Sequence, residues 1–170
     1  MKTIELKVLS ELMKNARLSD RELAKRVGCS QPTATRVRNK LEGNAFIKEY
    51  TTIPDFSKIG YEIMAFTFFK FSRVNTQEEI EKVRKIIRTG LQRGVDEVIM
   101  AERGMGMEYN GVAISLHRRY SDYTKFIDDL QQYSDILGVS EARSFLVNLR
   151  DPIQYRYLTL ATLAKHLRSS

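Results

Sequence analysis

The residues best suited to recognise another molecule lie between Ser30 and Lys40. Ser30 followed by Pro32 is typical of a helix start, because serine caps free amides and proline needs no amide partner there. Three apolar residues then recur at helical spacing and predict a buried side. The opposite side carries polar and cationic groups that could donate to bases, with Arg38 and Lys40 placed for phosphates. The predicted contact set is Ser30, Gln31, Pro32, Thr33, Thr35, Arg36, Arg38, Asn39 and Lys40.

The residues before this helix predict the partner that a helix-turn-helix requires. A first helix is expected over Thr3–Asn15, and a second begins after Ser19, which with Glu22 forms a capping-box pattern. Gly28 supplies the positive φ for a tight exit. Two short helices joined by such a turn form the unit whose second helix enters the major groove of DNA. The alternative is an ordinary three-helix bundle with a solvated face; the lack of acidic residues between Gly28 and Leu41 favours DNA.

The charge distribution agrees with this hypothesis. The net charge is +7, and residues 1–60 contain 12 Lys and Arg against 7 Asp and Glu. The other 110 residues contain 16 against 14. A basic module joined to a nearly neutral one suggests that the first part meets a polyanion, although a basic but inert surface remains the alternative.

Several classes of protein are not indicated. A single cysteine, Cys29, excludes an intrachain disulfide framework and a multi-cysteine metal site. No apolar run approaches the roughly 20 residues that span a bilayer, and no signal peptide is recognised. No phosphate-binding loop, dinucleotide fingerprint or metal motif occurs. We therefore predict a cytoplasmic protein that is not an enzyme and needs no cofactor, no metal and no membrane.

The remainder of the chain predicts strands and helices in alternation. The order strand, helix, strand, strand, helix, strand is the ferredoxin-like βαββαβ pattern. The strand Ile63–Ser72 is apolar on both faces, so helices should cover one face and a partner subunit could cover the other. The elements expected are a short strand at 46–53, strands Ile63–Ser72, Val95–Glu102, Val112–Arg118 and Val139–Leu149, and helices Thr76–Leu91 and from Ser121 onward.

The N-terminal third resembles a known family. Leu18–Ser30, then Val37–Glu42 followed by Phe46–Thr51, is similar to the Lrp/AsnC (feast/famine) regulators, and Asp55 to Tyr61 resembles their hinge. The resemblance is close over about 60 residues. It implies a transcription regulator that binds double-stranded DNA as a homodimer or a ring of dimers, sometimes in response to an amino acid. It also implies that the third helix is the recognition helix.

These observations together predict an α+β chain. An N-terminal helix-turn-helix domain (1–53) is followed by a hinge (54–62) and a ferredoxin-like effector and oligomerisation domain (63–151). A C-terminal helical extension (152–170) completes the chain, where the typical family member ends sooner. No function is assigned to this extension.

An effector site is a further expectation. Family members that bind amino acids usually show a Gly-x-Tyr-Asp type segment between the middle strands. Here the aspartate is missing, and Arg103–Met107 is expected to form a loop. Its glycines could let amides approach a carboxylate ligand, or could serve a mobile hairpin. The candidate residues are Gly104, Met105, Gly106, Met107 and Tyr109.

Two other functions compete with site-specific regulation. Sirohaem decarboxylases resemble this family in fold and use His and Arg on a tetrapyrrole, a role open to His117, Arg118 and Arg119. The intact basic helix argues against that reading, since an enzyme need not keep such a surface. The third possibility is an architectural DNA-coating protein without an effector.

Overall fold

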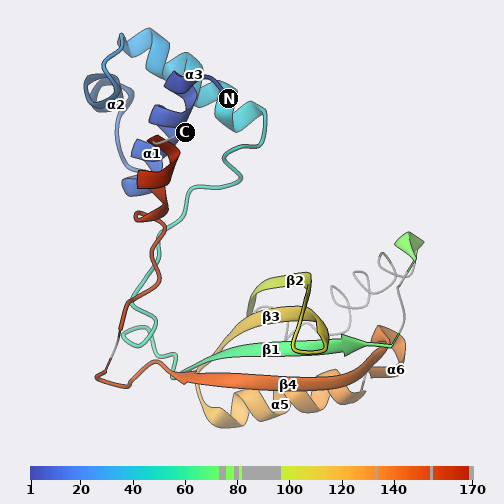
Figure 1. Ribbon diagram of the computed structural model, residues 1–170. Helices are drawn as coiled ribbons and strands as arrows, with labels where there is room; N and C mark the ends of the chain where they lie inside the picture. Colours follow the sequence, from blue (N-terminus) through green and yellow to red (C-terminus); the bar gives the residue numbers. More distant parts are fainter. Residues whose placement is uncertain (73–75, 79–80, 82–96, 133, 154, 169–170) are drawn as a thin grey trace. The chain divides into compact units, whose positions relative to one another are not determined.

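The chain folds into two compact units. The computed structural model describes residues 1–72, 76–78, 81, 97–132, 134–153 and 155–168 (Figure 1). One unit comprises Met1–Pro54 together with Gln154–Ser170, and the other comprises Asp55–Ile153. In the described ranges, every helix is too short or too polar to cross a membrane.

The first unit is built on three helices, α1 (Thr3–Lys14), α2 (Asp20–Val27) and α3 (Gln31–Gly43). Their apolar stripes meet in one cluster, as the helical spacing predicts. This cluster holds α2 and α3 together as a helix-turn-helix. Its buried members are Val8, Leu12, Leu18, Leu23, Ala24, Val27, Ala34, Val37 and Leu41.

Local chemistry sets the helix boundaries of this unit. The backbone amide of Glu22 donates to the Ser19 hydroxyl at 3.3 Å, and the amide of Ser19 donates to the Glu22 carboxylate at 2.9 Å, which closes the capping box. Gly28 ends α2 with φ of 75°, in the left-handed region. Ser30 caps α3 by accepting from the amide of Thr33 at 3.4 Å. The predicted helix starts at Ser19 and Ser30 are therefore confirmed.

The strand predicted at 46–53 is wrong. Ala45 turns the chain with φ of 54°, and the amides of Phe46 and Ile47 donate to the carbonyl of Leu41 instead of to a neighbouring strand. Ile47 packs on the helical core. The alternating pattern specifies an extended strand only where a partner strand is available, and none pairs with this segment among the described residues.

The C-terminal extension contributes a short 3-10 helix, η1 (Leu163–Arg168), to the first unit. The Ser10 hydroxyl of α1 donates to the carbonyl of Ala164 at 2.7 Å, and both residues are fully buried. The helix predicted from Pro152 onward is much shorter than expected. Aromatic residues before η1, such as Tyr155 and Tyr157, have low helix propensity, and at 101% and 75% exposed they bury too little surface to compensate for it.

The second unit contains an antiparallel sheet of four described strands in the order β2-β3-β1-β4. The strands are β1 (Ile63–Phe71), β2 (Val98–Gly106), β3 (Tyr109–His117) and β4 (Val139–Asn148). Helices α5 (Tyr120–Gln132) and α6 (Ser134–Leu137) lie between β3 and β4 in the chain. This arrangement confirms the ferredoxin-like fold. Most of the predicted helix Thr76–Leu91 lies outside the described residues.

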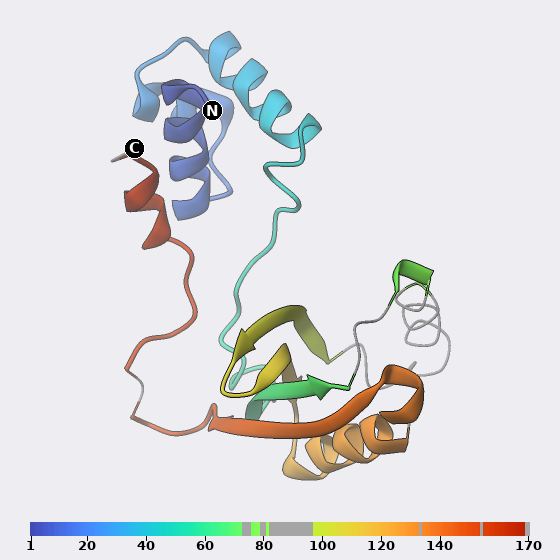
Figure 2. The same cartoon turned by 45° about the vertical axis from the view of Figure 1, so that its right-hand side comes forward.

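The two faces of the sheet differ. Helix α5 runs along one face (Figures 1 and 2), where Ala65 and Thr67 of β1 are fully buried. The opposite face carries Phe66, paired in register with Ile114 of β3 and Phe145 of β4. Phe145 is 66% exposed, and no described helix covers this face.

The loop predicted at Arg103–Met107 is also wrong. Strand β2 continues to Gly106, which pairs with Tyr109, and only Met107 and Glu108 form the turn. Their φ angles are 50° and 67°. Positive φ at both central residues gives a tight two-residue turn whose twist matches the flanking strands.

Candidate nucleic-acid interface

Helix α3 presents a polar side to solvent while its apolar side is buried. Ala34, Val37 and Leu41 are 0%, 6% and 1% exposed and fix the rotation of the helix about its axis. All nine predicted contact residues lie on α3 or at its N-cap. Ser30, Gln31, Pro32, Arg36, Asn39 and Lys40 are exposed, and Thr33, Thr35 and Arg38 are half-buried.

The three cations of α3 have different surroundings. Arg36 is exposed and forms no ion pair with a described residue. The ammonium of Lys40 lies 2.6 Å from the carboxylate of Glu5, and this hydrogen bond lowers the pKa of Glu5. Arg38 lies 3.0 Å from the carboxylate of Asp20 and is only 19% exposed. The expected phosphate contacts of Arg38 and Lys40 therefore compete with ion pairs inside the unit.

The polar side chains of α3 also differ in their partners. The Thr35 hydroxyl donates to Asp20 at 2.7 Å. The hydroxyls of Ser30 and Thr33 lie 2.9 Å apart and hydrogen-bond to each other. For the side chains of Gln31 and Asn39, no hydrogen bond is found within the described part of the chain. These two amides, with Arg36, are the groups left free to bind a ligand.

Tyr50 was not anticipated as part of this surface. Its hydroxyl donates to the carboxylate of Glu42 at 2.7 Å, which ties the segment after α3 to the C-terminal end of that helix. Burial, followed by the hydrogen bond to Glu42 and its negative charge, raises the pKa of Tyr50 to about 12. No local pattern pointed to this contact, because it depends on the turn at Ala45.

The candidate effector residues lie together on the β2–β3 hairpin. Gly104, Met105 and Gly106 are on β2, Met107 is in the turn and Tyr109 begins β3. Met105 and Met107 are 97% and 71% exposed. The Tyr109 hydroxyl donates to Glu141 of β4 at 2.9 Å, so it is already engaged.

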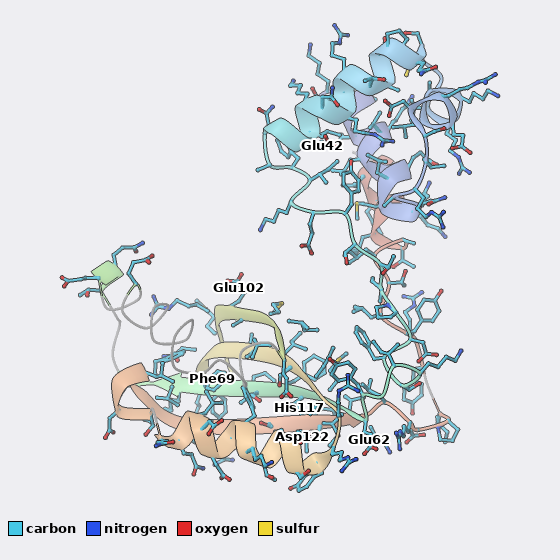
Figure 3. All side chains as sticks on the ribbon, turned by 180° about the vertical axis from the view of Figure 1, so that it is seen from behind. Glu42, Glu62, Phe69, Glu102, His117 and Asp122 are labelled. Carbon is cyan, nitrogen blue, oxygen red and sulfur yellow. The ribbon has the colours of Figure 1, made fainter. Side chains whose placement is uncertain are left out.

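His117, the residue on which an enzymatic reading depends, is fully buried beneath α5 (Figure 3). Its Nδ1 lies 2.7 Å from Glu97, and its Nε2 lies 2.8 Å from the hydroxyl of Ser115. The ring also packs edge-on against Tyr123. A buried, doubly hydrogen-bonded histidine supports the core of the second unit and is not open to a large ligand such as a tetrapyrrole. No cluster of three metal-binding side chains occurs among the described residues.

Comparison with known proteins identifies the first unit directly. Residues 1–44 match a family model described as winged helix-turn-helix DNA-binding. The chain is 40% identical over 63 residues to the leucine-responsive regulatory protein of Rhizobium meliloti, a match that spans 37% of this chain and 40% of that protein.

Two further similarities extend beyond the helix-turn-helix. A transcriptional regulator of Neisseria meningitidis, solved as a complex with L-Met, superimposes with a TM-score of 0.69 at 20% identity, covering 96% of this chain and 99% of that one. An uncharacterised HTH-type transcriptional regulator of Pyrococcus furiosus is 30% identical over 113 residues, which is 66% of this chain and 70% of that protein. Since this match is longer than the helix-turn-helix alone and covers 70% of that protein, the chain belongs to the Lrp/AsnC family of DNA-binding transcription regulators.

Proposed function

We propose that α3 is the recognition helix of a sequence-specific regulator and that it enters the major groove of duplex DNA. The observation that carries the proposal is the free state of Gln31, Arg36 and Asn39, which project from a helix whose other side is locked into the core. Arginine suits the edge of guanine, and the amides of Gln and Asn suit adenine. Lys40, half exposed beside Glu5, is placed to contribute to phosphate binding.

The proposal extends to a homodimer formed through the open face of the sheet. Apolar side chains from three strands share this face, most of them half-buried and Phe145 exposed, and a second copy would cover what remains open. A two-fold axis would present two α3 helices to half-sites about one helical turn, or a multiple of it, apart. The apolar residues that β1, β3 and β4 contribute to this open sheet face are Met64, Phe66, Phe68, Val112, Ile114, Leu116, Phe145 and Val147.

Binding-site selection with the purified full chain tests the function. The affinity for the selected duplex is then compared with that for a scrambled duplex of equal length. Arg36→Ala is expected to weaken binding to the selected duplex by about 1–3 kcal/mol and the scrambled duplex much less. Lys125→Ala, an exposed cation on α5, is the matched control. An equal loss on both duplexes for Arg36→Ala would contradict base recognition by this residue, and no binding to any duplex at low salt would contradict the function.

A small-molecule effector at the β2–β3 hairpin is part of the proposal. Support comes from the exposed Met105 and Met107, and from the L-Met complex of the Neisseria relative. Calorimetric titration with single amino acids tests this, with heat lost in Tyr109→Ala as the expected result. If no amino acid gives heat, the hairpin has no effector of this class.

Footprint length distinguishes a site-specific regulator from an architectural protein that coats DNA. A regulator protects a stretch of fixed length once its half-sites are filled. A coating protein protects a stretch that grows continuously with protein concentration. We expect a fixed footprint on the selected duplex.

A further inference from the structure

Asp20, the first residue of α2, contacts two side chains of the neighbouring helix. Its Oδ2 accepts the hydroxyl proton of Thr35 at 2.7 Å, and its Oδ1 lies 3.0 Å from Nε of Arg38. Arg38 has a second anchor, because one of its terminal nitrogens donates to the carbonyl of Leu18 at 2.6 Å. Asp20 and Leu18, the residue before the N-cap of α2, therefore hold the guanidinium from two sides.

The position of this ion pair makes it more persistent than a surface pair. The side chains of Arg38 and Asp20 are 19% and 24% exposed, and the facing Nε and Oδ1 atoms are shielded from solvent. These two atoms meet off the line of the N–H bond, so their attraction is mainly coulombic. Partial exclusion of water strengthens such an attraction and weakens its screening by salt. Arg38 is thereby kept at the α2–α3 junction.

Asp20 also determines which hydrogen-bonding groups Thr35 presents to DNA. A threonine hydroxyl has one proton, and the Thr35 proton points either to Asp20 or to the carbonyl of Gln31 at 3.1 Å. Both partners lie within the protein. Towards a groove, Thr35 then presents oxygen lone pairs and a methyl group. These suit the amino groups of adenine or cytosine and the methyl of thymine, but not the acceptor edge of guanine.

We propose that Asp20 is a positioning residue of the DNA-binding surface: it withholds Arg38 from the phosphates and fixes Thr35 as a hydrogen-bond acceptor. The inference rests on the function proposed above, since it concerns the same helix. It assigns to Arg38 a different role from the phosphate contact that its sequence position suggested. Of the three cations of α3, Arg36 and Lys40 then remain available to contact the nucleic acid.

The salt dependence of binding tests the first half of the inference. The full chain and the variants Arg38→Met, Asp20→Asn and Asp20→Asn/Arg38→Met are titrated against one scrambled duplex over a series of KCl concentrations. Each phosphate contact adds about 0.9 to the slope of log affinity against log salt. We expect the slope of Arg38→Met to equal that of the unmodified chain. Asp20→Asn should be steeper by about one contact and bind more tightly at low salt. The double variant should return to the original slope.

Several results would overturn the inference. One is a slope that flattens by about one contact in Arg38→Met, because Arg38 would then bind a phosphate in the native protein. Another is an Asp20→Asn variant that keeps its helical circular dichroism but has an unchanged slope. If Asp20→Asn fails to fold, Arg38→Met alone decides. Failure of the unmodified chain to bind any duplex contradicts the proposed function instead, so the two failures are distinguishable.

Binding-site selection with Thr35→Val tests the second half. Valine keeps the shape and the methyl group of threonine but replaces the acceptor hydroxyl with a second methyl group. We expect the variant to lose its preference for adenine or cytosine at one position of the selected sequence, by about tenfold. An unchanged sequence, or loss of a preferred guanine, would overturn the assignment of Thr35 as an acceptor.

Discussion

A charge placed at Phe145, on the open face of the edge strand β4, should separate the proposed dimer. Complete burial of a phenylalanine side chain contributes about 1.5–3 kcal/mol. Phe145 is 66% exposed, so about 1–2 kcal/mol remains to be gained by covering it. A two-fold interface contains this residue twice, which makes about 2–4 kcal/mol. Phe145→Glu forfeits that gain and should raise the dimer dissociation constant about 30- to 1000-fold.

Sedimentation velocity over a dilution series measures this change. Tyr155→Glu is the control, because Tyr155 is fully exposed and lies outside the sheet. The control should keep the association behaviour of the unmodified chain while Phe145→Glu shifts to the monomer. Since Phe145 is mostly exposed in one protomer, its replacement should leave the thermal midpoint of the isolated monomer nearly unchanged. A dissociation constant equal to that of the unmodified chain would refute the use of this face in assembly.

Four further predictions concern stability. Leu23→Ala creates a cavity at a fully buried position and should lower the free energy of unfolding by about 2–5 kcal/mol in urea titration. Ser19→Ala removes the cap of α2 and should cost about 0.5–2 kcal/mol, also seen in urea. Ser10→Ala leaves the buried carbonyl of Ala164 without its donor, so it should lower the thermal midpoint, whereas Ser121→Ala at an exposed site should not. Burial lowers the pKa of His117 below 6.5, more than the nearby Glu97 raises it. The unfolded chain therefore binds this proton more readily, and stability should be complete above about pH 6.5 and decline below it. The stability of the His117→Gln variant should decline less as the pH falls below about 6.5. A pH profile of stability identical to that of the unmodified chain would contradict a buried, neutral His117 ring.

The features predictable from the sequence are those determined by neighbours along the chain. Ser19 with Glu22, Gly28, and Ser30 with Pro32 each act within one helical turn, so their spacing already contains the geometry. The rotation of α3 follows from the spacing of its apolar residues for the same reason. The ferredoxin-like order likewise needs only the succession of strands and helices.

The features that escaped prediction depend on residues far apart in the chain or on unusual turn chemistry. The turn at Met107 and Glu108 has positive φ at two residue types that rarely adopt it. The sequence therefore predicted the loop around Gly104 and Gly106 instead. The segment 46–53 alternates like a strand but folds back on Leu41. The hydrogen bond that holds η1 against α1 joins residues 154 positions apart, and no local pattern encodes such a contact.

The ion pairs of the helix-turn-helix show why net charge is a poor guide to DNA contacts. Residues 1–60 are strongly basic, yet Arg38 and Lys40 lie against Asp20 and Glu5, which are distant in sequence. A cation held by a carboxylate must lose that partner before it gains a phosphate, and the exchange contributes less than a free cation would. Arg36 gives up no such partner among the described residues. The sequence specificity of this surface should therefore depend on Arg36 more than on the cations that outnumber it.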